Sequence, residues 1–376
     1  MPCVQYDSTN RHSPAGVAVE ASIQKDYLTD NKKTISMSPP TPSPGSPYRE
    51  EGPHVNKLLR GIELAVDEVL DNPDRPITRL EQEKLCYFAI KEFDLPITYS
   101  WYLAGACTKV SGEPSAAANR LNTSSTSIRE DTGEDPDVRE YRDYFASTEF
   151  FPDYTLRDIW FTNKYEFLQD FYEHYAPEEY LDLYLASTDI REQLENIDNL
   201  VQQETAHHSL SEWGAGSDDG VLTESDEREF RLLISDLHIE MSEIDDLSET
   251  ISVITRGTDV LEQVFAQLTT LDSISSDQSV VLDDLAAYFY DDVWRYPALY
   301  ISAQTAEGPN DYHLKGEHAT RFTEFHEDLL SRANRMRNLC MDVGLYPDIG
   351  HHAGQVDEDV NSHLNSVMKE YIEERE

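Results

Sequence analysis

A heptad pattern between Phe230 and Leu268 constrains the fold of this chain more than any other feature of its sequence. Ten of the twelve a and d positions in this stretch are apolar, where composition alone predicts about five. An upstream stretch repeats the spacing with six apolar residues at seven positions: Tyr180, Leu183, Ser187, Ile190, Leu194, Ile197 and Val201. Because a Gly- and Ser-rich segment at 206–220 separates the two stretches, we expect helices at 178–203 and 224–256. These would form a long, coiled-coil-like antiparallel hairpin.

The second predicted helix carries its own start and stop signals. Thr223 or Ser225 can cap it ahead of several acidic residues, and Gly257 is typical of a helix end. Glu240 occupies a seam position, so either the buried face shifts to Met241 or the carboxylate faces a cation or a partner. The alternative to packing within the chain is that the seam recruits a partner chain.

Further helical signals lie outside the hairpin. Residues 55–70 place apolar side chains at four-residue spacing, and Thr78 followed by Glu81 forms a capping box ahead of another helix. Residues 97–110 are apolar and aromatic with Gly105 inside, so they form either a strand and turn or a buried helix. Alternating strand patterns are otherwise almost absent, which predicts a mainly α fold built as a helical bundle.

Composition divides the chain into four regions. Six prolines crowd the segment from Met37 to Pro53, and each removes a backbone donor and fixes a dihedral angle, so neither a helix nor a sheet can propagate there. The predicted regions are a disordered leader at 1–54, an aromatic-rich helical region at 55–177 with a long loop at 111–138, the helical hairpin at 178–272 and a C-terminal helical region at 273–376.

The charge of the chain indicates its solvent. The sequence has 73 Asp and Glu against 30 Lys and Arg, a formal net charge of −43, and the acidic residues are spread through nearly every segment. Such a surface is typical of adaptation to molar salt, where charges are screened within about 3 Å. The composition therefore resembles that of an acidic cytoplasmic protein of a haloarchaeon. The alternative is that the acidity imitates nucleic acid or captures a basic partner. Binding to nucleic acid is not expected, although screening in molar salt weakens that argument.

Cysteine usage and hydropathy predict an intracellular chain. Cys3, Cys86, Cys107 and Cys340 include no C-x-x-C pair, and the first thirty residues lack the basic start and the apolar stretch of a secretory signal. Nowhere do eighteen apolar residues follow one another. We therefore expect free thiols, no membrane contact and a cytoplasmic location.

The chain lacks the common catalytic and phosphate-binding motifs, so no catalytic residue, cofactor or metal ligand is predicted. Glu204 and His207 form an E-x-x-H pair, but a di-metal bundle needs a second such pair and two further carboxylates that face it, and in a chain with 73 acidic residues and 12 histidines isolated pairs arise by chance. We expect the other candidate ligands to face solvent: His313, His318, His326, His351 and His352. A metal-dependent enzyme or metal-binding helical bundle that uses these residues is the alternative hypothesis for the function.

Arg332, Arg335 and Arg337 form the densest basic cluster of the predicted folded part. Arg332 and Arg335 share a helix face and could contact phosphate. Three cations are a weak electrostatic footprint, however, and pairing with acidic residues near the same helix end is the expectation.

One segment resembles the opening of Panacea-type antitoxin domains. In that family a helix with a K-L-x-Y/F-A core is followed by an aromatic run that leads into a glycine turn, and the matching residues here are Lys84, Leu85, Tyr87, Phe88, Ala89, Trp101, Tyr102 and Gly105. The resemblance covers some thirty of the 376 residues, and Gly105-Ala106 replaces the Gly-Pro expected at the turn. It implies a helical module that neutralises or recruits another protein. We therefore expect a protein-interaction or regulatory module, with another protein or a second copy of the chain as its partner.

Overall fold

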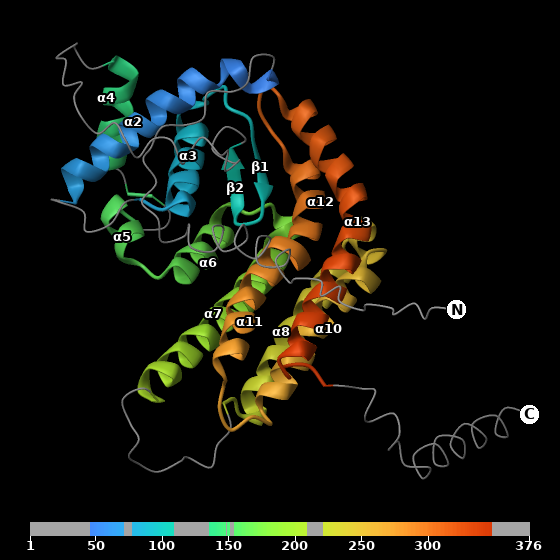
Figure 1. The fold of residues 1–376 in the computed structure, drawn as a ribbon. Helices are drawn as coiled ribbons and strands as arrows, with labels where there is room; N and C mark the ends of the chain where they lie inside the picture. The colour runs from blue at the N-terminus through green and yellow to red at the C-terminus, as the bar shows by residue number, and fades with distance from the viewer. Residues whose placement is uncertain are drawn as a thin grey trace, which may run out of the picture. The chain divides into compact units, whose positions relative to one another are not determined.

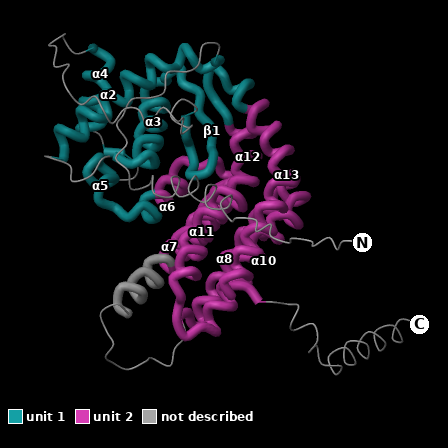
Figure 2. The backbone as a smooth tube through the Cα atoms, viewed as in Figure 1, with its two compact units in different colours: residues 1–167, 306–314 teal, residues 168–305, 315–376 magenta. Residues whose placement is uncertain are grey.

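The structure is a computed structural model, and it describes residues 46–70, 77–108, 135–147, 149–150, 154–208 and 221–347, without the side chains of 198–208. The described part is mainly α, with one two-stranded antiparallel sheet (Figure 1). The chain forms two compact units (Figure 2): unit 1 comprises residues 1–167 and 306–314, and unit 2 comprises residues 168–305 and 315–376. Residues 1–45 of the predicted leader and residues 111–134 of the predicted loop at 111–138 lie outside the described residues. A helix begins at Pro136, so the predicted end of the loop at residue 138 is wrong. The division into four regions stays a prediction.

The first described element of unit 1 lies within the proline-rich segment, where composition predicts neither a helix nor a sheet. Ser46 caps the 3₁₀-helix η2 (Pro47–Glu50) by accepting a hydrogen bond from the Tyr48 backbone N–H (3.3 Å). The side chains of Tyr48 and Glu51 are buried. Proline suits this first turn because its missing N–H would have no helical partner there. The predicted end of the leader at residue 54 is therefore wrong, since residues 46–54 belong to the fold.

The helix α2 (Gly52–Val69) carries the predicted apolar stripe and packs on α4 (Pro136–Ser147). Three residues of the stripe are fully or almost fully buried: Leu58, Ile62 and Val66. The two helices approach closely at Gly61, because a Cβ there would lie 2.5 Å from the Cβ of Tyr141. Glycine thus permits the backbone contact that the stripe then stabilises.

The helix α3 (Arg79–Phe93) begins at the predicted capping box, which is confirmed. Thr78 Oγ1 accepts from the Glu81 backbone N–H (3.2 Å), and the Glu81 carboxylate accepts from the Thr78 backbone N–H (2.7 Å). Two of the four free amide groups at the helix start are satisfied in this way.

A β-hairpin follows α3. The strand β1 (Tyr99–Tyr102) pairs with β2 (Gly105–Thr108), so the described part of the 97–110 segment, residues 97–108, adopts the strand alternative. The buried Lys84 of α3 donates to the carbonyl oxygens of Ala104 and Ala106 at the turn. A buried ammonium needs such acceptors, and here they attach the helix to the hairpin.

A segment from a distant part of the sequence completes unit 1. Tyr99 and Glu307 exchange backbone hydrogen bonds of 3.0 and 2.9 Å as an antiparallel bridge. The buried carboxylate of Glu51 accepts from the Thr98 backbone N–H (2.9 Å), from Thr98 Oγ1 (2.6 Å) and from Asn310 Nδ2 (2.7 Å). These bonds satisfy a charge that would be costly to bury alone.

Aromatic residues supply much of the core of each unit, as their density predicts. The helix α5 (Leu156–Phe161) buries Trp160 in unit 1 but leaves Phe161 exposed. The helix α6 (Lys164–Tyr175) has residues in both units, and its Phe171 and Tyr172 are buried in unit 2.

Unit 2 is a bundle of helices. Its remaining elements are η4 (Glu178–Tyr180), α7 (Leu181–His208), α8 (Glu224–Glu243), α9 (Asp245–Ser248), α10 (Ile251–Leu268), α11 (Ser276–Tyr288), the π-helix η5 (Phe289–Val293), α12 (Arg295–Thr305) and α13 (Asp311–Asp342), whose first residues belong to unit 1. Within the described part of the chain, no helix combines the length and the apolarity needed to cross a bilayer.

The heptad pattern does not form one long helix. Ile244 adopts an extended conformation (φ −101°, ψ 111°) that ends α8, and after the short α9 the chain returns as α10, which packs on α8. The return is antiparallel, because Phe230 near the start of α8 stacks on Phe265 near the end of α10 with ring centroids 3.5 Å apart. The continuous helix predicted over 224–256 is therefore wrong, and so is the predicted helix end at Gly257, which lies inside α10.

The helix α7 lies along α8 in the opposite direction. Asp182 near the start of α7 is within electrostatic reach of Glu240 near the end of α8, while Asp189, about two turns later, is within electrostatic reach of Asp236. Met241 is buried and Glu240 is half-buried. The buried face thus shifts to Met241, which was one of the two predicted alternatives.

Candidate functional site

The π-helix η5 is the most irregular element of unit 2. Its closing hydrogen bond runs from the Trp294 backbone N–H to the Phe289 carbonyl oxygen (2.7 Å), five residues earlier. Such elements are rare and frequently occur at functional sites. Here η5 carries two adjacent carboxylates, Asp291 and Asp292, and Asp292 is buried.

Arginines from three helices surround these carboxylates. Arg332 of α13 donates from Nη1 to Asp292 Oδ1 at 2.5 Å, and Arg295 of α12 and Arg191 of α7 lie within electrostatic reach of Asp291. Burial raises the pKa of both carboxyl groups, and the arginines oppose that rise. The arginines therefore favour the charged form that burial disfavours.

Aromatic rings hold these arginines in place. The guanidinium carbons of Arg332 and Arg295 lie 5.2 and 5.8 Å from the centroid of the Phe325 ring, and that of Arg191 lies 4.0 Å from the Tyr290 ring centroid. Cations are attracted to the faces of aromatic rings at such distances. The arginines are thus fixed by packing as well as by charge.

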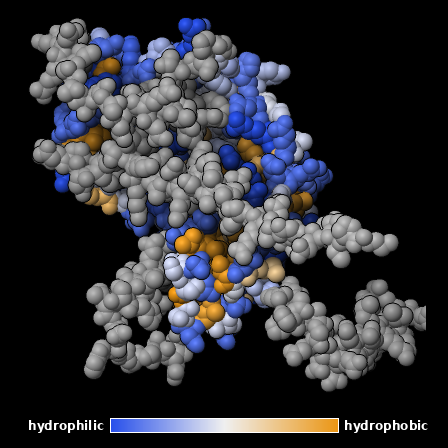
Figure 3. Space-filling view, in the orientation of Figure 1, coloured by the Kyte–Doolittle hydropathy of each residue, from blue (hydrophilic) through white to orange (hydrophobic). Residues whose placement is uncertain are grey.

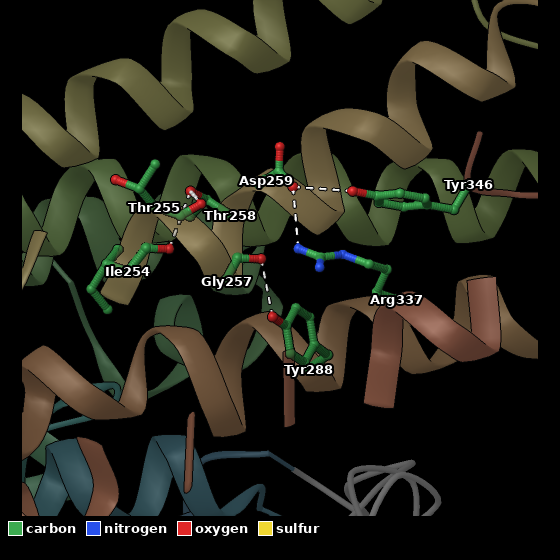
Figure 4. A network of polar contacts seen from close by, with 8 residues as sticks. All are labelled: Ile254, Thr255, Gly257, Thr258, Asp259, Tyr288, Arg337 and Tyr346. Carbon is green, nitrogen blue, oxygen red and sulfur yellow. Dashed lines mark hydrogen bonds and ion pairs between the residues drawn. The ribbon is translucent and has the colours of Figure 1, made fainter. Parts of the chain in front are cut away.

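A second polar network neighbours this cluster (Figure 4). Asp259 Oδ2 of α10 accepts from Tyr346 Oη (3.1 Å) and from Arg337 Nη2 (3.5 Å), while Tyr288 Oη of α11 donates to a main-chain carbonyl of α10 (3.0 Å). Burial raises the pKa of Tyr288, and the nearby Asp292 adds to the rise. The two networks together join α10, α11, η5 and α13.

The predicted pairing of the arginine cluster with acidic residues is observed, but the acids are not local. Arg332 binds a carboxylate 40 residues away in the sequence, and Arg337 binds one 78 residues away. Arg335 is exposed. Arg332 and Arg337 therefore connect α13 to other elements of unit 2. Their acidic partners could not be identified from spacing in the sequence, because they lie so far away along the chain.

The histidines do not assemble a metal site within the described residues. His318 is buried against Ser302 Oγ (2.5 Å) and His326 Nδ1 lies 2.9 Å from Tyr296 Oη, so the expectation that His318 faces solvent is wrong. His313 is exposed. The side chains of Glu204 and His207, with His351 and His352, lie outside the described residues. In the part that the structure describes, no group of three or more potential ligands could hold a metal ion.

Cys86 and Cys340 are free thiols of low reactivity. Cys86 and Cys340 are buried, which raises the pKa of both thiols, that of Cys340 to about 12. Thiols in such surroundings stay protonated and react slowly. Cys107 is half-buried, and Cys3 lies outside the described residues.

Large apolar side chains are exposed at few described positions. They are Phe161, Leu232, Ile239, Val280, Tyr312, Leu339 and Met341. Figure 3 shows apolar side chains gathered around α11, where Val280 is 47% exposed. On α13, Leu339 and Met341 are two residues apart and so point to different sides of the helix. On α8, Leu232 and Ile239 are seven residues apart and share one face.

This face of α8 is the candidate interaction surface, and we call it the α8 stripe. Its residues are all exposed and follow one another at three- and four-residue intervals: Arg228, Leu232, Ser235, Ile239 and Ser242. The buried residues Phe230, Ile234, Leu237 and Met241 lie on the opposite side of the helix. Leu232 and Ile239 are 59% and 53% exposed. The heptad pattern indicates the buried face of α8 and therefore did not predict the stripe. Leu232 and Ile239, two apolar residues outside the heptad positions, were the signal in the sequence that could have indicated it.

The chain matches a family described as a domain of unknown function (DUF8098) over residues 47–373. No curated protein and no solved structure gives a significant match.

Proposed function

Because the chain belongs to this family of domains of unknown function, no relative supplies an activity, and we propose from its own geometry that it is a protein-interaction module that docks a partner through the α8 stripe. The observation that carries the proposal is the exposure of Leu232 and Ile239 at the centre of the solvent face of α8. Fully burying one such side chain gains about 1.5 to 3 kcal/mol. A partner helix that covers both would thus gain a useful part of its binding free energy from them.

The acidic composition of the chain strengthens the interpretation of exposed Leu232 and Ile239 as part of an interface. With 73 acidic residues, the chain has ample polar side chains for a solvent-facing helix. Two branched aliphatic residues two turns apart therefore favour an interface over an inert surface. The polar networks around η5 support a scaffold role for the remaining helices, because Arg332 holds α13 to η5 and Arg337 holds α13 to α10.

The resemblance to Panacea-type antitoxin domains points to the same class of function. It rests on residues that build the fold of unit 1, such as the buried Lys84 and Trp101. Neutralising or recruiting a protein partner, which the resemblance implies, requires a docking face of the kind that α8 presents. An antitoxin-like role is the narrower form of our proposal.

Photo-crosslinking in cells tests the proposal. The light-activated residue p-benzoylphenylalanine is introduced at Leu232 and, separately, at Ile239, with the exposed Glu327 of α13 as the matched control. We expect discrete adducts of one mass from both α8 positions and none of that mass from position 327. Adducts that are the same at all three positions, or missing from α8, would overturn the proposal. Mass spectrometry of the adduct identifies the partner.

A further inference from the structure

We propose that the partner of the α8 stripe is a second copy of this chain, docked antiparallel about a two-fold axis that passes between Ser235 and Asp236. This inference rests on the proposed function and goes further by naming the partner. It is carried by the arrangement of apolar and charged residues along α8, which is complementary to itself only when one helix is reversed.

The apolar residues match under this symmetry. Leu232 and Ile239 lie equally far from the axis on opposite sides, and a helix rises a constant 1.5 Å per residue. Leu232 of one copy is therefore level with Ile239 of the second copy, and the reverse contact forms at the same time. Ser235, which is small, lies at the centre, where two helix backbones must approach most closely.

The charges at the two ends of the stripe match as well. Arg228 at the start of the stripe and Glu243 at the end of α8 are both exposed, and neither forms an ion pair with any described residue. The same axis places Arg228 level with Glu243 of the second copy. A parallel arrangement would instead oppose Arg228 to Arg228 and Glu243 to Glu243, which is repulsive.

The antiparallel pairing also reduces repulsion among the carboxylates at the C-terminal end of α8. Burial raises the pKa of Glu240, and its acidic neighbours Asp182, Glu243 and Asp236 raise it further. Carboxylates crowd this end of the helix, and an arginine from a second copy would offset their repulsion. An interface that is complementary to itself closes as a dimer and does not extend into a filament.

The net charge of −43 per chain sets the condition for association. Two such chains repel one another in dilute buffer, whereas molar salt screens charges beyond about 3 Å. Contacts through the faces of two helices lie at the small end of interface sizes. We therefore expect a reversible dimer that forms in molar KCl and depends on protein concentration.

Sedimentation equilibrium of the full chain in molar KCl tests the inference by charge exchange. We expect Arg228→Glu and Glu243→Arg each to weaken the dimer by roughly threefold, because each makes both symmetry-related contacts repulsive while molar salt largely screens exposed charges. The double variant should recover most of the affinity. Arg256→Glu, an equal change of charge at an exposed position of α10, should leave the dimer unchanged. Ile239→Asp should give a monomer with unaltered helical circular dichroism.

Three outcomes would overturn the inference. These are a wild-type monomer at every concentration, a double variant no better than the single variants, and an Arg256→Glu variant as weak as Arg228→Glu. The photo-crosslinking experiment keeps the two proposals distinguishable. A monomer whose α8 positions crosslink to a different protein would reject self-association and keep the interaction module, whereas the loss of all α8 adducts would reject both.

Discussion

At the scale of single residues, Gly308 shows how backbone conformation closes unit 1. Its φ of +111° lies in the region that side chains disfavour, and a Cβ there would lie 2.7 Å from Thr98 Cα and 2.8 Å from the Ile97 carbonyl oxygen. This close approach follows directly on the bridge between Tyr99 and Glu307. A residue with a side chain would separate the two strands of the bridge.

We expect Gly308→Ala to destabilise the protein by at least about 1 to 3 kcal/mol, since backbone strain of that size is joined by a clash with main-chain atoms. The matched control is Gly316→Ala in α13, where a Cβ would meet nothing within 4 Å. The control should stabilise by about 0.5 to 1 kcal/mol, because alanine favours a helix over glycine. Denaturant titrations in molar KCl measure both changes. Equal effects of the two substitutions would contradict the role of Gly308.

The pair of Asp292 and Arg332 makes a second prediction, about pH. The pKa of Asp292 is raised above its ordinary value of 3.8, chiefly by burial, and Arg332 opposes the rise through both charge and a hydrogen bond. The folded state therefore holds this proton more tightly than the unfolded state. The stability gained by binding this proton in the folded state is therefore present at low pH, and it is lost as the pH rises through the pKa of Asp292 in the folded protein.

Replacing Arg332 by glutamine should raise the pKa of Asp292 further, because the opposing charge is gone. The free energy of unfolding of Arg332→Gln should then fall increasingly below that of the wild type between about pH 4 and pH 7. Urea titrations across this range in molar KCl measure the difference. In an Asp292→Asn background the pH dependence of the Arg332→Gln effect should shrink to the smaller contribution of Asp291, whose pKa Arg332 also lowers. A difference that is constant with pH in both backgrounds would argue against the pair.

At the scale of elements, the return of α10 onto α8 depends on the short connection between them. Leu247 of α9 is fully buried, so Leu247→Ala should cost about 2 to 5 kcal/mol through lost burial and a cavity. Leu232→Ala makes the same chemical change on the exposed α8 stripe and should stay within about 0.5 kcal/mol. Both values come from denaturant titrations at constant molar salt. Similar costs at the two positions would mean that the stripe is covered within the chain.

The same elements show what the sequence could predict. Periodicity marked Phe230, Leu237, Leu261 and Phe265 as buried, and they are buried. It could not tell that α8 and α10 bury these residues against each other, because a heptad pattern reports which face is covered and not what covers it. The break at Ile244 had no Pro or Gly to mark it. Capping at Thr78, in contrast, was predictable because its partner lies three residues away.

The candidate site was less predictable than the fold. The acidic partners of Arg332 and Arg337 lie 40 and 78 residues away, and in a chain with 73 acidic residues no spacing distinguishes them. The π-helix also has no sequence signature here, since "FYDDV" reads as an ordinary helical segment.

At the scale of the whole molecule, the charge of −43 governs stability. Lowering KCl from 1 M to 0.1 M lengthens the screening distance from about 3 Å to about 10 Å, so repulsion among carboxylates grows. We expect the thermal midpoint, followed by circular dichroism, to fall as the salt is removed. Replacing KCl by an uncharged osmolyte should not restore it. A midpoint that holds or rises in 0.1 M KCl would contradict adaptation to molar salt.

The discontinuity of unit 1 has a consequence for the making of the protein. Residue 167 leaves the ribosome 147 residues before residue 314 does, a delay of roughly 7 to 30 s at typical rates of synthesis. During that interval the Glu51 carboxylate lacks its hydrogen bond from Asn310, and the backbone of Tyr99 lacks its hydrogen bonds with Glu307. The nascent N-terminal part must therefore persist with an incomplete interior while the inserted helices emerge, and a fragment that ends at residue 167 would stay in that immature state.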